Sequence, residues 1–324
     1  MIGSQDDLYR NLGLDLVRAT EAAAQSAAHQ MGLGNPAICD HSASDAMIQA
    51  LNNTDLNGRI VIGEEGKRFA GAVLRSGQKL GNGKGPLIDL VADPVDGCRL
   101  LARGYPGAIS VIAAAPANTL WAPVPAAYMQ KIVVDAEVGE RLVPECLDAP
   151  PAWTLALVAR AKGKKVSELT VFILERPRHA DLIAEIRAAG AHVKMYSDGD
   201  VAGALVAAMV SSNVDLLMGV GGIPEGLIGA CAVRALGGNM IGRLAPQSAE
   251  EHRAIREAGL DMAHIMTEND LVCTNEVLFA ATGITEGPLL PGIRFERRLA
   301  VSESMIIRGH TRTRRIIHAE RLLE

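Results

Sequence analysis

The chain has 324 residues and a formal net charge of −5 at pH 7, so it has no general electrostatic attraction for nucleic acid. Hydrophobic residues make up 48% of the sequence and aromatic residues only 3%, so we expect a sizeable core of Ala, Val, Leu and Ile. Five cysteines without a CxxC pair argue against a zinc site or a disulfide framework, and no apolar stretch is long enough for a membrane-spanning helix. With a polar N-terminus unlike a signal peptide, the sequence predicts a cytoplasmic protein.

The first half of the sequence, residues 1–150, is expected to form an N-terminal α+β domain that carries a metal site. Apolar spacing predicts helices at 12–31, 40–51 and 99–103. We expect Asp40, Ser42 or Ser44 to cap the second of them. Short apolar runs predict strands at 59–62, 87–92, 108–113 and 128–134. The proline-rich segment 144–153 is expected to connect the two domains.

The second half, residues 151–324, is expected to form a C-terminal α/β domain, and both domains are expected to contribute to one active site. Strand and helix patterns alternate here, which predicts a mostly parallel sheet. The expected strands lie at 169–174, 193–196, 214–220, 271–273, 277–280 and 302–307. The expected helices lie at 180–189, 200–209 and 225–236, the second of them capped by Asp198 or Asp200. A basic C-terminal cluster lacks interleaved aromatic residues and is therefore not expected to bind nucleic acid; it comprises Arg308, Arg312, Arg314 and Arg315.

The most informative stretch follows the apolar run 87–92 and reads Asp93-Pro94-Val95-Asp96-Gly97. Pro94 is expected to end the strand, and Gly97 allows a tight turn. Asp93 and Asp96 would then be held on a rigid turn at a strand end. Hard divalent cations such as Mg²⁺ prefer oxygen ligands of this kind. For this pentapeptide alone, a surface turn is an equally good interpretation.

Further acidic residues lie at expected strand ends or helix starts, and all of them except Asp40 are beside a glycine. They are Asp40, Glu64, Glu65, Asp198, Asp200 and Glu225. Each of them alone is most often a helix cap or part of a solvated turn. If several converge, they could hold two or three Mg²⁺ or Mn²⁺ ions, which neutralise phosphate charge and lower the pKa of a bound water.

Two segments could bind a phosphate group. The glycine-rich run 219–226 leads into an expected helix, and its backbone N–H groups could receive an anion, although its spacing is not that of a dinucleotide-binding fingerprint. Arg176 and Arg178 follow an expected strand, and arginine suits bidentate phosphate binding, with a solvated basic loop as the common alternative. We interpret His179 as a structural or surface histidine and 128–131 as edge-strand packing.

Taken in order, these motifs resemble class II fructose-1,6-bisphosphatases over nearly the whole chain. The resemblance rests on residues 60–64, 93–97, 108–113, 128–131, 177–179, 198–200, 221–226 and 281–285. It implies the layered α/β/α/β/α sandwich of the lithium-sensitive, metal-dependent sugar phosphatases. It also implies hydrolysis of the 1-phosphate of fructose 1,6-bisphosphate, and in some members of sedoheptulose 1,7-bisphosphate, by in-line attack of a water activated by Mg²⁺ or Mn²⁺. A homo-oligomer, dimer or tetramer, is expected on the same ground.

The resemblance also implies roles for individual residues. One metal would be held by Asp93, Asp96 and Glu225, and another by Asp40 and Glu64. Catalysis would depend on Glu64, Asp93, Asp96 and Cys98. The sugar bisphosphate would contact Asp96, Gly97, Cys98, Tyr128, Arg176, Pro177, Arg178, Asp198, Gly199, Asp200 and Gly222.

Three departures from the family pattern affect this expected site. Cys98 stands where the family has a threonine whose hydroxyl is thought to orient the attacking water, and a thiol is a weaker hydrogen-bonding group. The segment 35–39 lacks the lysine that usually precedes the first aspartate, and 63–70 has fewer acidic residues than the family. These departures leave open a weakly active or inactive paralogue that binds a sugar phosphate or regulates a partner, or an enzyme with a changed substrate.

Overall fold

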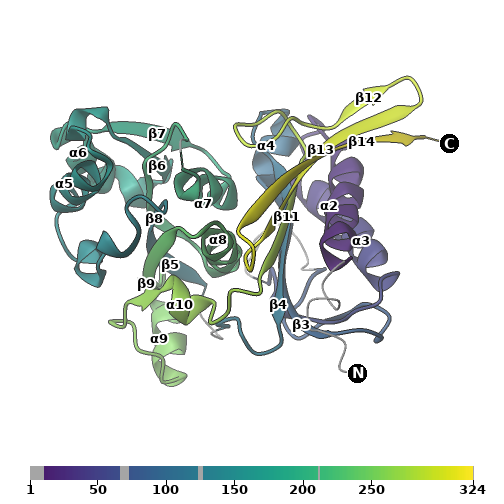
Figure 1. The fold of residues 1–324 in the computed structure, drawn as a ribbon, viewed down its shortest axis with the longest axis horizontal. Helices are drawn as coiled ribbons and strands as arrows, with labels where there is room; N and C mark the ends of the chain where they lie inside the picture. Colours follow the sequence, from purple (N-terminus) through teal and green to yellow (C-terminus); the bar gives the residue numbers. More distant parts are fainter. Residues whose placement is uncertain (1–10, 66–72, 123–126, 211, 324) are drawn as a thin grey trace. The chain divides into compact units, whose positions relative to one another are not determined.

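The computed structural model describes residues 11–65, 73–122, 127–210 and 212–323, which form two compact units (Figure 1). The first unit comprises Met1–Leu120 together with Glu276–Glu324, and the second comprises Trp121–Asn275. This division differs from the expected boundary at residue 150. The strand that follows residue 127 pairs within the second unit, and the C-terminal strands return to the sheet of the first unit.

The first unit contains a mixed sheet with the strand order β12-β13-β11-β4-β3-β1-β2, and β14 also pairs with β13. Its strands are β1 (Asn57–Ile62), β2 (Lys79–Leu80), β3 (Leu87–Asp96), β4 (Ile109–Pro116), β11 (Leu278–Gly283), β12 (Arg294–Glu296), β13 (Leu299–Arg308) and β14 (Thr313–Leu322). Among the described residues of this sheet, only the β1–β3 pair is parallel. Its helices are α2 (Leu12–Ala28), α3 (Pro36–Asn52) and α4 (Cys98–Arg103), and α2 and α3 lie side by side against the sheet (Figure 1).

Helix α3 begins four residues earlier than the sequence pattern suggested, at Pro36. The side chain of Asn35 accepts hydrogen bonds from the backbone N–H groups of Ala37 and Ile38, so Asn35 is the N-cap. Proline at the first helical position lacks only an N–H that would be unsatisfied there anyway. The expectation that Asp40, or a serine after it, caps this helix is therefore wrong. Asp40 instead lies inside the helix with its side chain buried.

Strand β3 does not end before Pro94, as expected, but continues to Asp96. In the ladder with β4, Asp93 is paired with Val111 and Asp96 with Ile109, so β3 has one extra residue at this point. A bulge of this kind tolerates proline because the local ladder hydrogen bonds are already interrupted. The bulge places both acidic residues in a buried strand instead of a surface turn, with 3% of Asp93 and 4% of Asp96 exposed.

The second unit contains another mixed sheet, with the strand order β10-β9-β5-β8-β6-β7. Its strands are β5 (Tyr128–Val134), β6 (Thr170–Leu174), β7 (His192–Tyr196), β8 (Leu216–Gly222), β9 (Asn239–Leu244) and β10 (Met266–Thr267). Among the described residues of this sheet, the β6–β7 and β6–β8 pairs are parallel and the other three pairs are antiparallel, so the expectation of a mostly parallel sheet is wrong. The two mixed sheets with interleaved helices confirm the expected α/β class.

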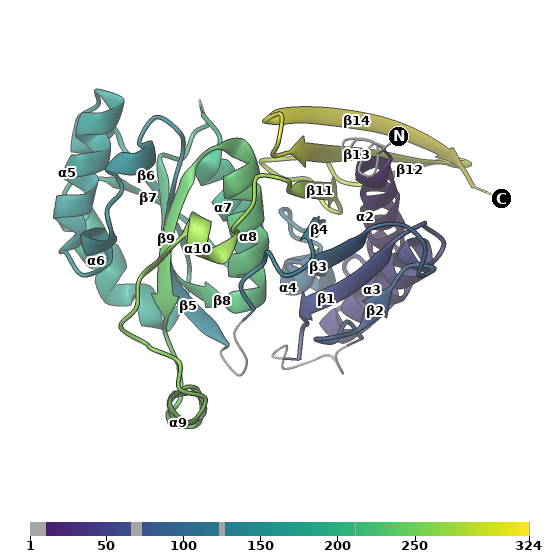
Figure 2. The same ribbon diagram turned by 60° about the horizontal axis from the view of Figure 1, so that its bottom comes forward.

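Helices cover both faces of the second sheet. They are α5 (Pro151–Lys162), α6 (Ala180–Ala188), α7 (Asp200–Ala208), α8 (Ile223–Leu236), α9 (Ala249–Glu257) and α10 (Glu268–Leu271). Helices α5 and α6 lie on one face, whereas α7 and α8 lie on the other (Figure 2).

The segment expected as a domain connection, 144–153, instead forms a 3₁₀ helix at Pro144–Leu147 and the start of α5. The strand expected at 271–273 is also wrong, because Leu271 ends α10. No helix within the described parts of the chain is both long and apolar enough to span a membrane.

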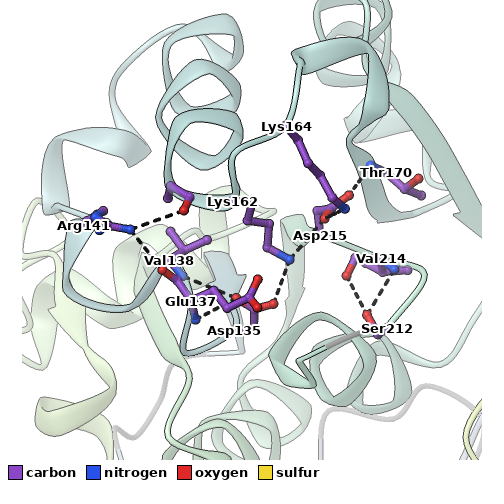
Figure 3. A network of polar contacts seen from close by, with 11 residues as sticks. Asp135, Glu137, Val138, Arg141, Lys162, Lys164, Thr170, Ser212, Val214 and Asp215 are labelled. Atoms are coloured by element: carbon purple, nitrogen blue, oxygen red, sulfur yellow. Dashed lines mark hydrogen bonds and ion pairs between the residues drawn. The ribbon is translucent and has the colours of Figure 1, made fainter.

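A buried network of charges joins the ends of three strands in this unit (Figure 3). The Lys162 ammonium lies 2.7 Å from Asp135 Oδ2 and 3.1 Å from Asp215 Oδ1. Lys164 Nζ lies 2.6 Å from the same Asp215 oxygen, and the Thr170 backbone N–H donates to Asp215 Oδ2 at 2.9 Å. Asp135 follows β5, Asp215 precedes β8 and Thr170 begins β6, so the network closes one edge of the sheet.

We expect Lys162→Met to destabilise the protein by ~3–5 kcal/mol, because it leaves two buried carboxylates without their shared cation. Lys164→Met is the matched control: its side chain is 40% exposed, so the expected loss is below ~1 kcal/mol. Urea unfolding of both variants measures the difference. Equal losses would contradict this account of the network.

The same network predicts how stability changes with pH. Burial alone would raise the pKa of Asp215, but Lys164, the Thr170 N–H and Lys162 together lower it from 3.8. The folded state therefore binds this proton less readily than the unfolded chain, so the stabilisation is lost as the pH falls below about 4. Burial would lower the pKa of Lys162, but the two aspartates raise it from 10.5, so that contribution is lost as the pH rises above this value.

Candidate active site

Three carboxylates converge in the first unit. Asp40 on α3, Glu64 two residues after β1 and Asp93 on β3 each bring one oxygen within 4.8 Å of the others. Strands β1 and β3 are parallel neighbours, so their carboxyl ends lie at the same edge of the sheet, and α3 packs against β3. The three residues are between 0 and 3% exposed. The structure therefore brings together three of the five residues expected to bind metal.

The composition of this acidic cluster (Asp40, Glu64 and Asp93) suits a hard divalent cation. Buried carboxylates repel one another and are costly to desolvate, and a cation with oxygen ligands removes both costs. Asp93 Oδ1 already accepts the Val95 backbone N–H at 3.0 Å, which fixes the direction of this carboxylate. The cluster could therefore hold a metal ion. Asp96 is also buried but lies outside this group of three, so its role as a ligand stays a prediction.

Cys98 contacts the acidic cluster directly. Its Sγ lies 3.3 Å from Asp40 Oδ1 and 3.1 Å from the Val95 carbonyl oxygen, and only 3% of the residue is exposed. It begins α4, immediately after Gly97, whose φ of 96° places the turn in the left-handed region that favours glycine. A thiol has one hydrogen to share between the two acceptors. The departure from the family pattern at position 98 therefore affects Asp40, a candidate metal ligand. Of the other departure, the acid-poor segment 63–70, residues 66–70 lie outside the described part of the chain.

The expected substrate residues of the second unit gather at one edge of its sheet. Tyr128 begins β5 and is paired in the ladder with Gly222, the last residue of β8. The Arg178 guanidinium donates from Nε and Nη2 to the Val220 carbonyl oxygen at 3.2 and 2.7 Å. It also lies over the Tyr128 ring, 5.4 Å from the ring centroid. This edge is opposite the one closed by Asp135, which follows the other end of β5.

A second arginine lies at the same edge. Arg176 Nη2 is 3.1 Å from Asp198 Oδ1, and its Nη1 donates to the Ser197 carbonyl oxygen. Burial lowers the pKa of Arg178, yet an arginine stays charged in proteins. Arg176 and Arg178 thus place two guanidinium groups close together in the chain, and Asp198 neutralises the charge of Arg176. The charge of the pair favours an anionic ligand. Gly199, with φ 96°, is the N-cap of α7, so neither Asp198 nor Asp200 is the cap that we expected.

His179 is a structural histidine, one of the two roles considered for it. Its Nδ1 donates to the Leu174 carbonyl oxygen at 2.7 Å, and its Nε2 accepts the Val220 N–H at 2.8 Å. Those two bonds require the neutral ring, and burial lowers the pKa of His179. The imidazole thus links β6 to β8 beyond the end of their ladder, whose last pair is Phe172 with Leu217. It also fixes the loop that carries Arg178.

The first four residues of the glycine-rich run form a strand end, and phosphate binding by the run stays a prediction. Residues 219–222 belong to β8 and are paired with β5. The Ile223 N–H donates to the Ala127 carbonyl oxygen, and Pro224 has no N–H. Glu225 lies in the first turn of α8, and a Cβ on Gly222 would be 2.0 Å from its Oε2. Glu225 belongs to the second unit, and its role as a metal ligand stays a prediction.

Lys131 was interpreted as part of an edge strand, and that interpretation is wrong. Strand β5 lies between β8 and β9, so Lys131 occupies the interior of the sheet with 1% of its surface exposed. Its Nζ is 2.6 Å from Asp200 Oδ2, one of the expected substrate residues. The available signal was the alternation of Met129, Lys131 and Val133, which places a lysine on a face otherwise formed by apolar residues.

Comparison with known proteins supports the resemblance. Residues 10–321 match the family model described as "Bacterial fructose-1,6-bisphosphatase, glpX-encoded". The chain is 38% identical to the "Fructose-1,6-bisphosphatase class 2" of Haemophilus influenzae, an alignment that covers 98% of both chains. It is 37% identical to the "Fructose-1,6-bisphosphatase 1 class 2" of Escherichia coli K12, over 98% of this chain and 97% of the relative.

Proposed function

This chain belongs to the bacterial class II fructose-1,6-bisphosphatase family, and from that membership we propose that it hydrolyses the 1-phosphate of fructose 1,6-bisphosphate. The observation that carries the proposal is the convergence of Asp40, Glu64 and Asp93, buried carboxylates on three different elements. Membership of the family places the protein among the hydrolases of gluconeogenesis. We further propose that it is a cytoplasmic homo-oligomer, dimer or tetramer, and that sedoheptulose 1,7-bisphosphate is a second substrate.

In this proposal, Asp40, Glu64 and Asp93, with Asp96 and Glu225, hold Mg²⁺ or Mn²⁺. When bound, such an ion neutralises phosphate charge and lowers the pKa of a water molecule, which prepares that water to attack phosphorus in line with the leaving oxygen. The protein's own contribution is to bury the carboxylates and fix their directions. The Val95 N–H does this for Asp93, and the thiol of Cys98 does it for Asp40.

The second unit supplies the residues proposed to bind the sugar bisphosphate. Arg178 and Arg176 offer charged N–H donors to a phosphate group, and the carboxylates of Asp198 and Asp200 accept hydrogen bonds from sugar hydroxyls. Tyr128 adds a phenolic hydroxyl beside Arg178. The remaining proposed contacts are Asp96, Gly97, Cys98, Pro177, Gly199 and Gly222.

One observation favours a second candidate, a weakly active or inactive paralogue that binds a sugar phosphate or regulates a partner. Cys98 replaces the family's threonine at a position in contact with Asp40, and a thiol is the weaker hydrogen-bonding group. Reduced activity is therefore part of the proposal. The presence of all five acidic residues expected to bind metal argues for the enzyme, because the three that converge would repel one another without a metal.

The experiment is phosphate release from fructose 1,6-bisphosphate and sedoheptulose 1,7-bisphosphate, each with Mg²⁺ and with Mn²⁺. Fructose 1-phosphate and fructose 6-phosphate are controls for the requirement for two phosphates. We expect release from fructose 1,6-bisphosphate to yield fructose 6-phosphate. Binding without release of phosphate from any bisphosphate would instead support the inactive paralogue.

A further inference from the structure

Lys131 is among the largest fully buried side chains of the described chain, and it carries a charge. It lies at the centre of β5, and its side chain points to the face of the sheet covered by α7. The ammonium reaches Asp200, the first residue of α7, at 2.6 Å. Asp200 itself is 7% exposed. The ion pair is therefore almost fully removed from water.

The end of strand β8 is shaped around this ion pair. A Cβ at Gly221 would lie 2.0 Å from Asp200 Oδ2 and 2.6 Å from Lys131 Nζ, so any larger residue there would displace one of the two. Gly221 is paired in the ladder with Met129 and precedes Gly222. Glycine at position 221 is thus required by the ion pair.

The energetics of buried ion pairs argue against a purely structural purpose. Desolvation of both charges offsets much of their attraction, so well-packed apolar residues would often serve stability equally well. The neighbouring acid of the same loop, Asp198, is likewise held by a cation, Arg176, at 3.1 Å. Both carboxylates of the segment Asp198–Gly199–Asp200 therefore have their own positively charged partner.

We propose that Lys131 is a positioning residue, which holds the carboxylate of Asp200 in the direction needed to accept hydrogen bonds from the hydroxyl groups of the sugar. The inference rests on the proposed function, which makes Asp200 a substrate contact. Without the ammonium, the buried carboxylate loses its ion-pair partner and is no longer held in this direction. The acceptor is then misplaced, whereas the phosphate-binding arginines remain.

The test compares Lys131→Met with Lys162→Met. Both variants remove a buried lysine from an ion pair with aspartate in the same unit, but Lys162 pairs with Asp135, which follows the far end of β5. The network around Lys162 is drawn in Figure 3. Hydrolysis of fructose 1,6-bisphosphate is measured with each variant, together with unfolding in urea. We expect Lys131→Met to raise KM by about tenfold or more with kcat within about threefold, as for loss of a charged hydrogen bond. Lys162→Met should lower stability and leave KM within about twofold.

Lys131→Met leaves a buried charge and can unfold, so the double variant Lys131→Met/Asp200→Leu, which has no acceptor at position 200, keeps the test decisive. It removes both charges, and we expect stability near that of the wild type but a KM as high as that of the single variant. A wild-type KM in the double variant, or equal KM values for the Lys131→Met and Lys162→Met variants, would overturn the inference. A wild-type protein that neither hydrolyses fructose 1,6-bisphosphate nor binds fructose 6-phosphate would contradict the proposed function itself.

Discussion

Replacing Asp93 by asparagine is expected to lower hydrolysis of fructose 1,6-bisphosphate by about a thousandfold or more. The substitution keeps the shape of the side chain but removes one of three negative charges that converge within 4.8 Å. Loss of metal-derived stabilisation of the transition state costs several kcal/mol, and each ~1.4 kcal/mol corresponds to a factor of ten. A chelator in excess should have the same effect on the wild type. Undiminished hydrolysis in chelator would rule out the metal-dependent mechanism.

The same substitution, Asp93→Asn, should increase the stability of the metal-free protein although it lowers activity. Asp93→Asn relieves repulsion between buried carboxylates, so we expect the metal-free variant to unfold at a higher temperature than the metal-free wild type. Addition of Mn²⁺ should raise the unfolding temperature of the wild type by mass action and that of the variant much less. A variant that is destabilised without metal would show that Asp93 has a structural role instead.

Asp89 provides the matched control on the same strand. It is 1% exposed, and its carboxylate accepts hydrogen bonds from Arg59 Nη2 at 3.0 Å and from the Asn118 backbone N–H. Asp89→Asn should therefore destabilise the protein by about 1–3 kcal/mol, because it weakens bonds to a charged group. Its metal affinity and its rate of hydrolysis should stay close to those of the wild type. Calorimetric titration with Mn²⁺ measures the affinity of both variants.

The acidic cluster shows how much of this site was predictable from the sequence. Strand ends are marked by short apolar runs followed by glycine or proline, so Glu64 and Asp93 were placed correctly near the ends of β1 and β3. The helix start at Asn35-Pro36 was also a readable signal, yet it was missed in favour of later caps. The bulge in β3 was not predictable, because it depends on the register with β4.

Lys131 shows what local sequence patterns leave undetermined. Whether a strand is central or at an edge depends on its partners, and β5 pairs with β8 and β9, which are distant in sequence. The same long-range pairing brings residues 121–150 into the second unit, whereas β11 to β14 return to the first sheet. A lone lysine near a tyrosine was therefore interpreted as edge-strand packing. Its partner, Asp200, could be identified only from the fold.

The thiol of Cys98 is expected to affect the rate of hydrolysis. It lies within hydrogen-bonding distance of Asp40 Oδ1 and of the Val95 carbonyl oxygen, so its one hydrogen cannot serve both acceptors fully. A hydroxyl in this place would be a stronger donor and a stronger acceptor, and could pass on a proton from an attacking water. Groups that orient or deprotonate a nucleophile typically contribute ~10²–10⁴-fold to the rate.

We therefore expect Cys98→Thr to raise hydrolysis of fructose 1,6-bisphosphate at least several-fold, whereas Cys98→Ala should lower it. Cys146→Thr, at a cysteine that is 1% exposed in the second unit, is the control for a hydroxyl buried elsewhere and should not increase the rate. A gain with Cys98→Thr alone would identify the wild type as a phosphatase detuned at this position. If the wild type is already fast and the threonine variant no faster, the thiol is an adequate substitute and the inactive paralogue is excluded. If neither protein hydrolyses any bisphosphate while both bind one, the proposal of an active enzyme falls, because the defect then lies outside position 98.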